Sequence, residues 1–237
     1  MTTLAIVESN RTKAELLCHY LTTRCGYEVV AMEYCAASAF RAVERCKPEV
    51  ILASLTMPDL SATEMIAQLR SAASAARIIG LVSRCSEYLV HSLTRTGYQA
   101  LFCDTDEGLA GLLQTIDHVL RGRRVVSASI VNCQLGLRSA PAAFPKLLSN
   151  RELEALICIA HSMTDEEIGR QMAISAGTAQ SHRKRIMGKL GIHSTPKLIS
   201  YCAEKGFQSA ALPLQTLRNE KKPKADAVWL GRQMQTA

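Results

Sequence analysis

The sequence predicts an α/β domain with a doubly wound, five-stranded parallel sheet, followed by an all-α domain of four short helices. Two patterns indicate this fold class. Over residues 1–125, short apolar runs alternate with amphipathic stretches, which is typical of parallel strands joined by crossover helices. Over residues 146–207, consecutive helix-start signals precede short amphipathic stretches.

The first domain is expected to contain five strand-plus-helix units. The strands are apolar and short enough to be covered on both faces, and we place them at residues 4–7, 28–32, 50–54, 78–82 and 100–103. The helices between and after them are expected near residues 11–23, 36–46, 61–71, 86–96 and 107–121.

Two segments have the composition of connections. Residues 126–145 are rich in Ser, Ala, Gly and Pro and include SAPAAFP, which favours a linker over a packed element. Residues 208–237 show no steady period and include KKPK, so we expect a flexible basic tail. The second domain therefore spans residues 146–207.

Each helix of the second domain is expected to begin at a capping signal. Ser149 with Glu152 and Thr164 with Glu167 fit the S/T-x-x-E capping box. Ser175 precedes the third helix, and the run Ser194-Thr195-Pro196 opens the fourth. These signals predict four separate helices.

The charge of the chain is unevenly distributed. Its formal net charge is +7, and residues 1–125 sum to zero, so the whole excess lies in residues 126–237. A basic half joined to a neutral half suits a protein that meets a polyanion at one end. An ordinary solvated basic surface is the alternative.

Composition also excludes several classes of protein. The nine cysteines form no CxxC pair and have no paired histidine at zinc spacing, so we expect no metal and no cofactor. The N-terminus lacks the features of a secretion signal, and no apolar run approaches about 18 residues. We expect a cytoplasmic protein with inert thiols and no membrane partner.

The segment TDEEIGRQMAISAGTAQSHRKRIMGKLGI predicts two helices joined by a tight turn at Ala173-Ile174-Ser175, which is the layout of a helix-turn-helix. Residues at helical spacing on the second helix, with His182 alongside, would face the core: Ala179, Ile186 and Leu190.

The opposite face of this helix suits the DNA major groove and carries Gln180, Ser181, Lys184, Arg185 and Gly188. Cations can contact phosphates and guanine edges, an amide can pair with adenine, and a small hydroxyl permits close approach. Free N–H groups at the helix starts near Thr164 and Thr178 could hold phosphate oxygens. An amphipathic helix with a solvated charged face is the alternative.

The stretch from LSNRELEAL to AEKGF resembles the DNA-binding domain of the LuxR/FixJ type along its whole length of about sixty residues. The matching residues are Leu148, Arg151-Glu152, Glu167-Ile168, Ser175, Thr178, His182, Ile186, Lys189-Leu190 and Gly206. The resemblance implies DNA contacts at Thr164, Thr178, Gln180, Ser181, His182, Lys184, Arg185 and Lys189. Two departures are Ala179-Gln180 where the family usually has Val-Lys, and Ser162-Met163 where it has Gly-Leu. The first puts the sequence preference in doubt.

By the same resemblance, the fourth helix would pair two such modules through Leu198, Ile199 and Cys202. Its apolar face could equally be ordinary core. A homodimer predicts a two-fold symmetric operator in double-stranded DNA, with half-sites about one helical turn apart.

Residues 1–125 resemble the CheY-like receiver domain of two-component response regulators, with LAIVES, PEVILASLTMP and RTGYQALFC in matching order. Receiver chemistry needs paired acids after the first strand, an aspartate ending the third, a hydroxyl after the fourth and a lysine after the fifth. These groups gather at the carboxyl ends of the strands.

Aligned residue by residue, the receiver site is degenerate. The paired acids become Glu8 and Ser9, the phosphoacceptor becomes Ser54, the hydroxyl becomes Val82 with Ser83 beside it, and the lysine becomes Asp104. Mg²⁺ should bind weakly, because it needs oxygen ligands anchored by carboxylates. A serine hydroxyl cannot form an acyl phosphate, so we expect a pseudo-receiver.

What replaces phosphate as the input is open. A small ligand or a partner protein could act at the receiver-like domain. Oxidation of Cys85 or Cys103 near the former acid pocket is a weaker alternative, because reactive cysteines need exposure and electropositive neighbours.

The sequence therefore predicts a sequence-specific DNA-binding transcription regulator that acts as an atypical response regulator without phosphorylation. It is not expected to be an enzyme, because no Gly-rich phosphate loop follows the first strand and no nucleophile elbow is present. Two alternatives stay open: a conventional phospho-activated response regulator, and a protein-interaction adaptor that does not bind DNA.

Overall fold

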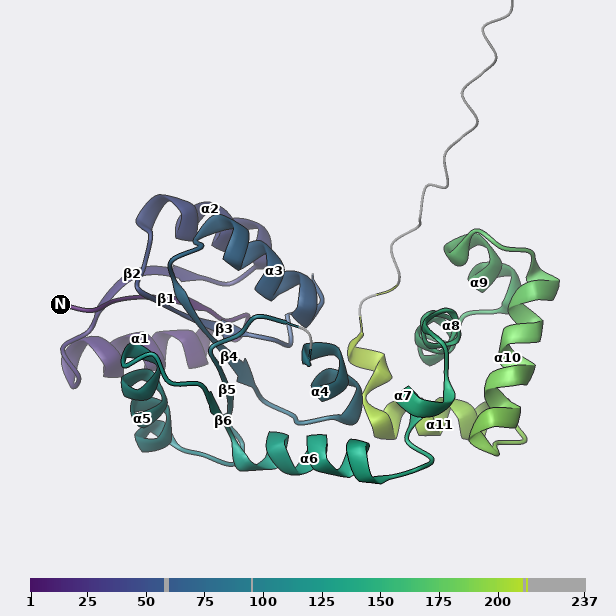
Figure 1. The fold of residues 1–237 in the computed structure, drawn as a ribbon. Helices are drawn as coiled ribbons and strands as arrows, with labels where there is room; N and C mark the ends of the chain where they lie inside the picture. The colour runs from purple at the N-terminus through teal and green to yellow at the C-terminus, as the bar shows by residue number, and fades with distance from the viewer. Residues whose placement is uncertain (58–59, 95, 211, 213–237) are drawn as a thin grey trace, which may run out of the picture.

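A computed structural model describes residues 1–57, 60–94, 96–210 and 212. Most of the basic tail expected at residues 208–237, with its KKPK run, lies outside the described residues. The described chain forms an N-terminal α/β domain and a C-terminal helical domain, as the fold-class prediction required (Figure 1).

Within the described residues, six strands form one parallel sheet in the order β2-β1-β3-β4-β5-β6. The strands are β1 (Thr3–Val7), β2 (Glu28–Glu33), β3 (Val50–Ser54), β4 (Arg77–Val82), β5 (Ala100–Cys103) and β6 (Val125–Val126). The first five were predicted. The sixth is a two-residue edge strand beside β5 that the sequence patterns did not indicate.

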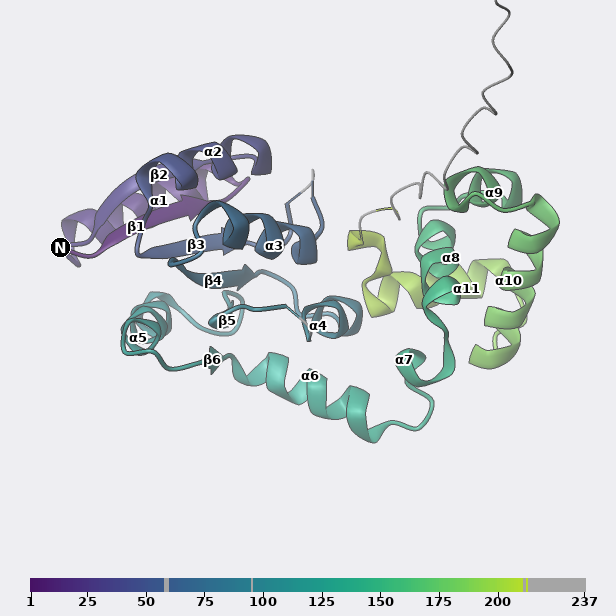
Figure 2. The ribbon, with the colours of Figure 1, turned by 45° about the horizontal axis from the view of Figure 1, so that its top comes forward.

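Helices cover both faces of the sheet. One face is covered by α1 (Arg11–Thr23) and α5 (Leu109–Leu120), and the other by α2 (Ala36–Cys46), α3 (Ala62–Ala72) and α4 (Glu87–Leu93) (Figure 2). Alternate residues of β1 show the division: Leu4 and Ile6 pack with α1 and α5, whereas Ala5 and Val7 pack with α2 and α3. The strand ends that carry the receiver-like residues meet at one edge.

The linker prediction for residues 126–145 is wrong over most of its length. Residues Ala128–Ser139 form helix α6, which packs against α4. Ile130, Cys133 and Leu137 recur at helical spacing and pack on the receiver-like core, and Ile130 is fully buried. The high content of Ser, Ala and Gly obscured this apolar stripe. A short helix, α7 (Phe144–Leu147), follows before the second domain.

The C-terminal domain consists of α8 (Asn150–Ala160), α9 (Asp165–Met172), α10 (Ala176–Leu190), α11 (Thr195–Lys205) and a short 3-10 turn, η1 (Phe207–Ser209). The predicted capping boxes at Ser149 and Thr164 are confirmed, and Ser175 accepts a hydrogen bond from the Thr178 amide. Ser194 makes no side-chain cap, but Pro196 lies in the first turn of α11. One apolar core joins these helices.

The two domains touch where α4 meets the end of α11. Lys205 Nζ lies 2.7 Å from Glu87 Oε1, and the rings of Tyr88 and Phe207 stack with centroids 4.8 Å apart. Gly206 adopts φ +84°, and a Cβ there would lie 2.3 Å from Ser86 Oγ. The close approach therefore requires glycine. Helix α10 lies on the side of its domain away from the sheet (Figure 1).

No helix in the described part of the chain is both long enough and apolar enough to cross a lipid bilayer.

Ser162 occupies a left-handed backbone conformation, with φ +60°, in the turn between α8 and α9. This is a position where the resembling family has glycine. We expect Ser162→Gly to raise the free energy of unfolding by about 1 kcal/mol, because an L side chain is strained in this region. Urea denaturation of the full chain measures the change.

The matched control is Ser200→Gly at an exposed position inside α11. There glycine should lower the free energy of unfolding by about 0.5–1 kcal/mol. Destabilisation of the chain by both substitutions would contradict the argument from backbone strain.

Candidate functional site

Helix α10 presents the expected polar face to solvent. Gln180, Ser181, Lys184, Arg185 and Gly188 are all exposed. On the opposite face, Ala179 and Ile186 are buried in the domain core, and His182 is half-buried beside them. The structure thus brings the predicted groove-facing side chains together on one continuous helical surface.

Arg183 fixes the orientation of α10. Its Nε donates to Asp165 Oδ1 at 2.8 Å, and its Nη2 donates to the Met163 carbonyl at 3.1 Å, so it ties α10 to the start of α9. Gly169 permits the close packing of the turn, because a Cβ there would lie 2.9 Å from the Ile174 carbonyl oxygen. The role of Arg183 could not be predicted from the sequence, because its partner lies in another helix and the RKR run does not indicate which cation is bound internally.

Thr164 and Thr178 serve as capping residues. The Thr164 amide donates to Glu167 Oε2 at 2.8 Å, and the Thr178 amide donates to Ser175 Oγ at 3.1 Å. The first turn of α9 also carries three acidic residues, which repel a phosphate group. A phosphate contact at either helix start would therefore have to use other amides.

Lys189 is held by an internal ion pair. Its Nζ lies 2.7 Å from Oε2 of Glu152, a buried carboxylate that also completes the capping box of α8. Burial alone would raise the pKa of Glu152, but hydrogen bonds from Lys189 and Ser149 lower that pKa to about 2. Lys189 therefore joins α10 to α8 and is not a free cation on the DNA-facing surface.

The three residues expected to make dimer contacts differ in how deeply they are buried. Leu198 and Cys202 have no exposed surface, and the Cys202 thiol donates to the Leu156 carbonyl inside the domain. A fully buried side chain cannot touch a partner molecule, which corrects the expectation for these two residues. Ile199 is half-buried and remains a candidate contact.

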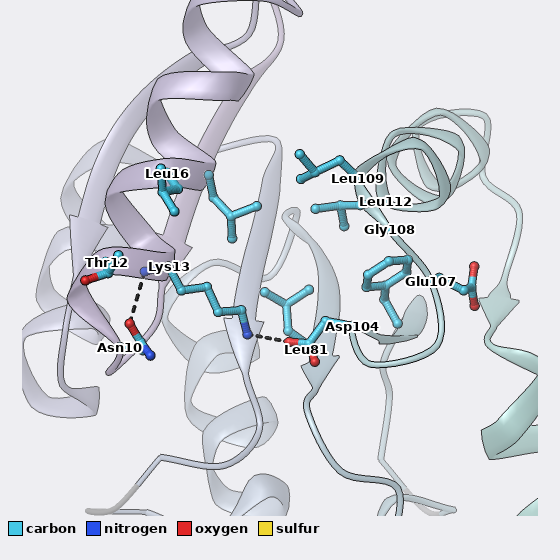
Figure 3. A pocket seen from close by; sticks show the side chains of 12 residues that line it. Asn10, Thr12, Lys13, Leu16, Leu81, Asp104, Glu107, Gly108, Leu109 and Leu112 are labelled. Atoms are coloured by element: carbon cyan, nitrogen blue, oxygen red, sulfur yellow. Dashed lines mark hydrogen bonds and ion pairs between the residues drawn. The ribbon is translucent and has the colours of Figure 1, made fainter.

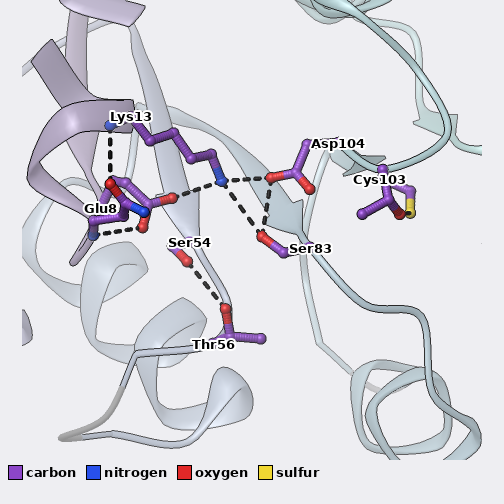
Figure 4. Close-up of polar contacts among 9 residues, drawn as sticks. Glu8, Lys13, Ser54, Thr56, Ser83, Cys103 and Asp104 are labelled. Atoms are coloured by element: carbon purple, nitrogen blue, oxygen red, sulfur yellow. Dashed lines mark hydrogen bonds and ion pairs between the residues drawn. The ribbon is translucent and has the colours of Figure 1, made fainter. Parts of the chain in front are cut away.

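The residues of the degenerate receiver site gather at the carboxyl edge of the sheet (Figure 4). Glu8 follows β1 and is buried, whereas Ser9 is exposed. Ser54 ends β3, is 1% exposed, and shares a hydrogen bond of 3.3 Å with Thr56. Val82 ends β4 and is buried, and Asp104 follows β5.

Lys13, on α1, crosses this site and was missed by the sequence analysis. Its ammonium lies 2.7 Å from Glu8 Oε2, donates to Asp104 Oδ2, and lies 3.4 Å from Ser83 Oγ. Ser83 Oγ also donates to Asp104 Oδ2 at 3.0 Å. Burial lowers the pKa of Lys13. The hydrogen bonds and charges of Asp104 and Glu8 together raise this pKa by more, so the net shift is upward.

The residues present do not fit the magnesium ion that a receiver fold implies. Mg²⁺ requires near-octahedral oxygen coordination. Here the Lys13 ammonium already pairs with Glu8, and Ser9 and Ser54 carry hydroxyl groups where the fold has carboxylates. Among the described residues, no cluster of three acidic, His or Cys side chains is arranged to hold a metal ion.

The thiols near this edge have an environment that suppresses reactivity. Burial and the neighbouring Cys133 raise the pKa of Cys85 to about 12, and Cys103 is buried. A thiol with such a pKa is almost wholly protonated at neutral pH, and the thiolate is the reactive form. This environment supports inert thiols over an oxidation sensor.

The Glu152–Lys189 pair predicts a pH-dependent contribution to stability. Because the folded pKa of Glu152 is about 2, below its ordinary value of 4.5, this contribution is present above pH 4.5 and is lost as the pH falls toward 2. At pH 7, Lys189→Met should cost about 1–2 kcal/mol, between the values for exposed and buried pairs.

Urea unfolding at pH 7 and near pH 3 measures this effect, and the cost should be smaller at the lower pH. Lys184→Met, which removes an exposed cation of the same helix, is the matched control and should change neither value. Equal costs for the two substitutions would show that the ion pair does not stabilise the domain.

Comparisons with known proteins agree with this geometry. The family model described as "Bacterial regulatory proteins, luxR family" matches residues 146–202. The transcriptional regulatory protein MctR of Rhizobium johnstonii is 31% identical over 165 residues, which cover 68% of this chain and 74% of that protein. The oxygen regulatory protein NreC of Staphylococcus aureus is 33% identical over 192 residues, which cover 75% of this chain and 86% of that protein.

Solved structures share the fold over most or part of the chain. RcsB from Salmonella enterica serovar Typhimurium, bound to promoter P1flhDC with the phosphomimetic BeF3−, matches with TM-score 0.60 and 16% identity over 86% of this chain and 98% of that chain. A LuxR-family two-component response regulator from Aurantimonas sp. matches with TM-score 0.52 and 24% identity over 59% of this chain and all of that chain. At these identities the matches show the fold alone.

The family assignment rests on the exposed face of α10, on the receiver-like sheet and on relatives that span both domains. The chain belongs to the luxR family of bacterial regulatory proteins, as a DNA-binding transcriptional response regulator whose receiver-like domain precedes its helix-turn-helix.

Proposed function

We propose that this regulator binds a specific operator without being phosphorylated. The observation that carries the proposal is the Lys13 ammonium, held between Glu8 and Asp104 at the edge of the sheet. An internal cation there takes the place that a divalent cation would need. The site is then a permanent part of the fold and not a reaction centre.

Two further features of the same edge support the loss of phosphorylation. Ser54 stands where the acceptor carboxylate would be, and a serine hydroxyl gives an ester instead of an acyl phosphate. Its side chain is buried and bonded to Thr56, so a phosphodonor has poor access to it. Asp104 has the opposite charge to the lysine that would hold a transferred phosphoryl group, and it would repel that group.

DNA recognition is assigned to the exposed face of α10. Lys184 and Arg185 are free of the internal bonds that hold Arg183 and Lys189, so they are available to phosphates and guanine edges. Gln180 and Ser181 lie on the same face and can approach base edges. The excess positive charge of residues 126–237 would attract the duplex.

We propose that the protein acts on DNA as a homodimer. Pairing would use the exposed side of α11 around Ile199, because Leu198 and Cys202 are enclosed in the core. A two-fold axis between two modules requires a two-fold symmetric operator, with half-sites spaced by about one turn of DNA.

Treatment with acetyl phosphate and Mg²⁺ tests the phosphorylation claim. Intact-mass spectrometry of the full chain should show no added phosphoryl group, and DNA affinity should change by less than about twofold. Ser54→Asp should also remain unmodified, since Lys13 would still exclude the metal. A hydroxylamine-labile phosphoryl group that forms on the Ser54→Asp variant, but not on the unaltered chain, would place the block at Ser54 and contradict the role of Lys13.

Phosphorylation of the unaltered chain with a tenfold rise in DNA affinity would favour the conventional response regulator instead.

Selection from a random duplex library with the purified full chain tests specific DNA binding. A two-fold symmetric motif should be enriched. The double variant Lys184→Ala, Arg185→Ala should lose about hundredfold in affinity for that motif, and the slope of log affinity against log salt should become shallower by about 2.

The matched control removes two exposed cations from α2 of the receiver-like domain, as Arg41→Ala, Arg45→Ala. This variant should keep its affinity within about twofold. Equal losses in the two double variants would indicate nonspecific charge attraction. Absence of any enriched motif, with no salt-sensitive binding, would favour the adaptor that does not bind DNA.

A further inference from the structure

A cavity of about 460 Å³ opens on the receiver-like domain between α1 and α5 (Figure 3). It lies on the face of the sheet away from α4, and therefore away from the contact with the helix-turn-helix domain. Its volume is within the range of about 300–1,000 Å³ that is usual for small-molecule sites.

The walls of the cavity are apolar. They are formed by side chains from both helices and from the ends of β4 and β5, namely Leu16, Leu17, Leu81, Phe102, Leu109 and Leu112. Two of these are unusually open for leucine: Leu16 is 65% exposed and Leu109 is 43% exposed. They flank the cavity on α1 and α5 (Figure 3), so an occupant would remove this apolar surface from water.

One end of the cavity is polar, because Lys13 and Asp104 line it. The Lys13 ammonium donates to Asp104 and Ser83 and forms an ion pair with Glu8, whose Oε2 lies 2.7 Å away. Lys13 is therefore already bound to three groups of the chain itself. Asp104 accepts both of its bonds through Oδ2, and a carboxylate has about four acceptor positions in all. At Asp104, this end of the cavity can therefore accept hydrogen bonds from an occupant.

The charge at this end is also unbalanced. Two carboxylates, Glu8 and Asp104, share one ammonium, so the cluster carries a net negative charge next to an apolar wall. A cationic group placed beside Asp104 would neutralise the cluster. An anionic group beside Asp104 would instead add repulsion.

We propose that this cavity binds a small organic ammonium, with its apolar body between α1 and α5 and its charged nitrogen at the Asp104 carboxylate. The ligand binds with the Lys13 bonds intact, because Asp104 uses acceptor positions that Lys13 and Ser83 leave open. The site shares the contact between Lys13 and Asp104 with the proposed function, but ligand binding requires neither DNA nor the absence of phosphorylation.

Isothermal titration of the full-length protein with three probes of nearly equal shape tests the proposal: 2-phenylethylamine, 2-phenylethanol and phenylacetate. The amine should bind saturably, the alcohol about tenfold more weakly, and the carboxylate not detectably at millimolar concentrations. Equal binding of all three probes, or preference for the carboxylate, would overturn the proposed ligand chemistry. Absence of saturable binding of the amine would overturn the site itself.

Two variants locate the binding. Asp104→Asn leaves Glu8 and Lys13 as a neutral pair and should abolish the preference for the amine over the alcohol. Leu109→Trp fills the cavity from its exposed rim and should abolish binding of the amine, whereas Leu135→Trp at an exposed position on α6 should have no effect. The thermal unfolding midpoint of each variant shows that the chain remains folded.

A second copy of the chain could also cover the exposed leucines. Sedimentation of the full chain, with and without the amine, distinguishes this occupant. A monomer–dimer equilibrium that neither the amine nor Leu109→Trp changes leaves the cavity open and supports the proposal. A dimer that Leu109→Trp dissociates, and on which the amine has no effect, would assign the surface to self-association and overturn it.

Discussion

The receiver-like domain depends on the bonds that the Lys13 ammonium makes with two carboxylates. This ammonium joins α1 to the ends of β1 and β5 by bonding Glu8 and Asp104, two carboxylates that would repel each other without it. Removing Lys13 would leave a buried, unpaired Glu8 at the edge of the sheet. Under the proposed function, the same bonds also keep a divalent cation from Glu8. Stability of this edge and the proposed lack of phosphorylation would then both follow from one contact.

Internal ion pairs also orient the helix-turn-helix. Of the four cations between residues 183 and 189, Arg183 and Lys189 are bonded to carboxylates of α9 and α8, and these bonds fix the direction in which α10 faces. Lys184 and Arg185 then project from a helix whose rotation is set. Rigid placement of such side chains is what groove recognition requires, because base contacts depend on angle as well as distance. The receiver-like domain contacts the DNA-binding domain away from α10, where Tyr88 of α4 packs against Phe207 after α11.

Much of this fold could be predicted from the sequence, because strands and helices differ in apolar period and the capping residues mark where helices begin. Helices 11–23 and 36–46 match their predicted ranges. Helix α6 could not be recognised from its composition. Lys13 was missed because its partners lie on strands far along the chain, and periodicity says nothing about such pairs. Leu198 and Cys202 were assigned to a dimer by resemblance, and the sequence could not test this, because an apolar helical face looks the same whether it meets its own core or a partner.

The most direct test of the role of Lys13 is a nuclear magnetic resonance titration of the full-length protein with Mg²⁺ and beryllofluoride, observed at the backbone amides. If Lys13 fills the site, the signals of Glu8, Ser54 and Asp104 will not shift at millimolar concentrations of either reagent. Saturable shifts at these three residues would show that the site still accepts a metal and a phosphoryl mimic, and would contradict the account.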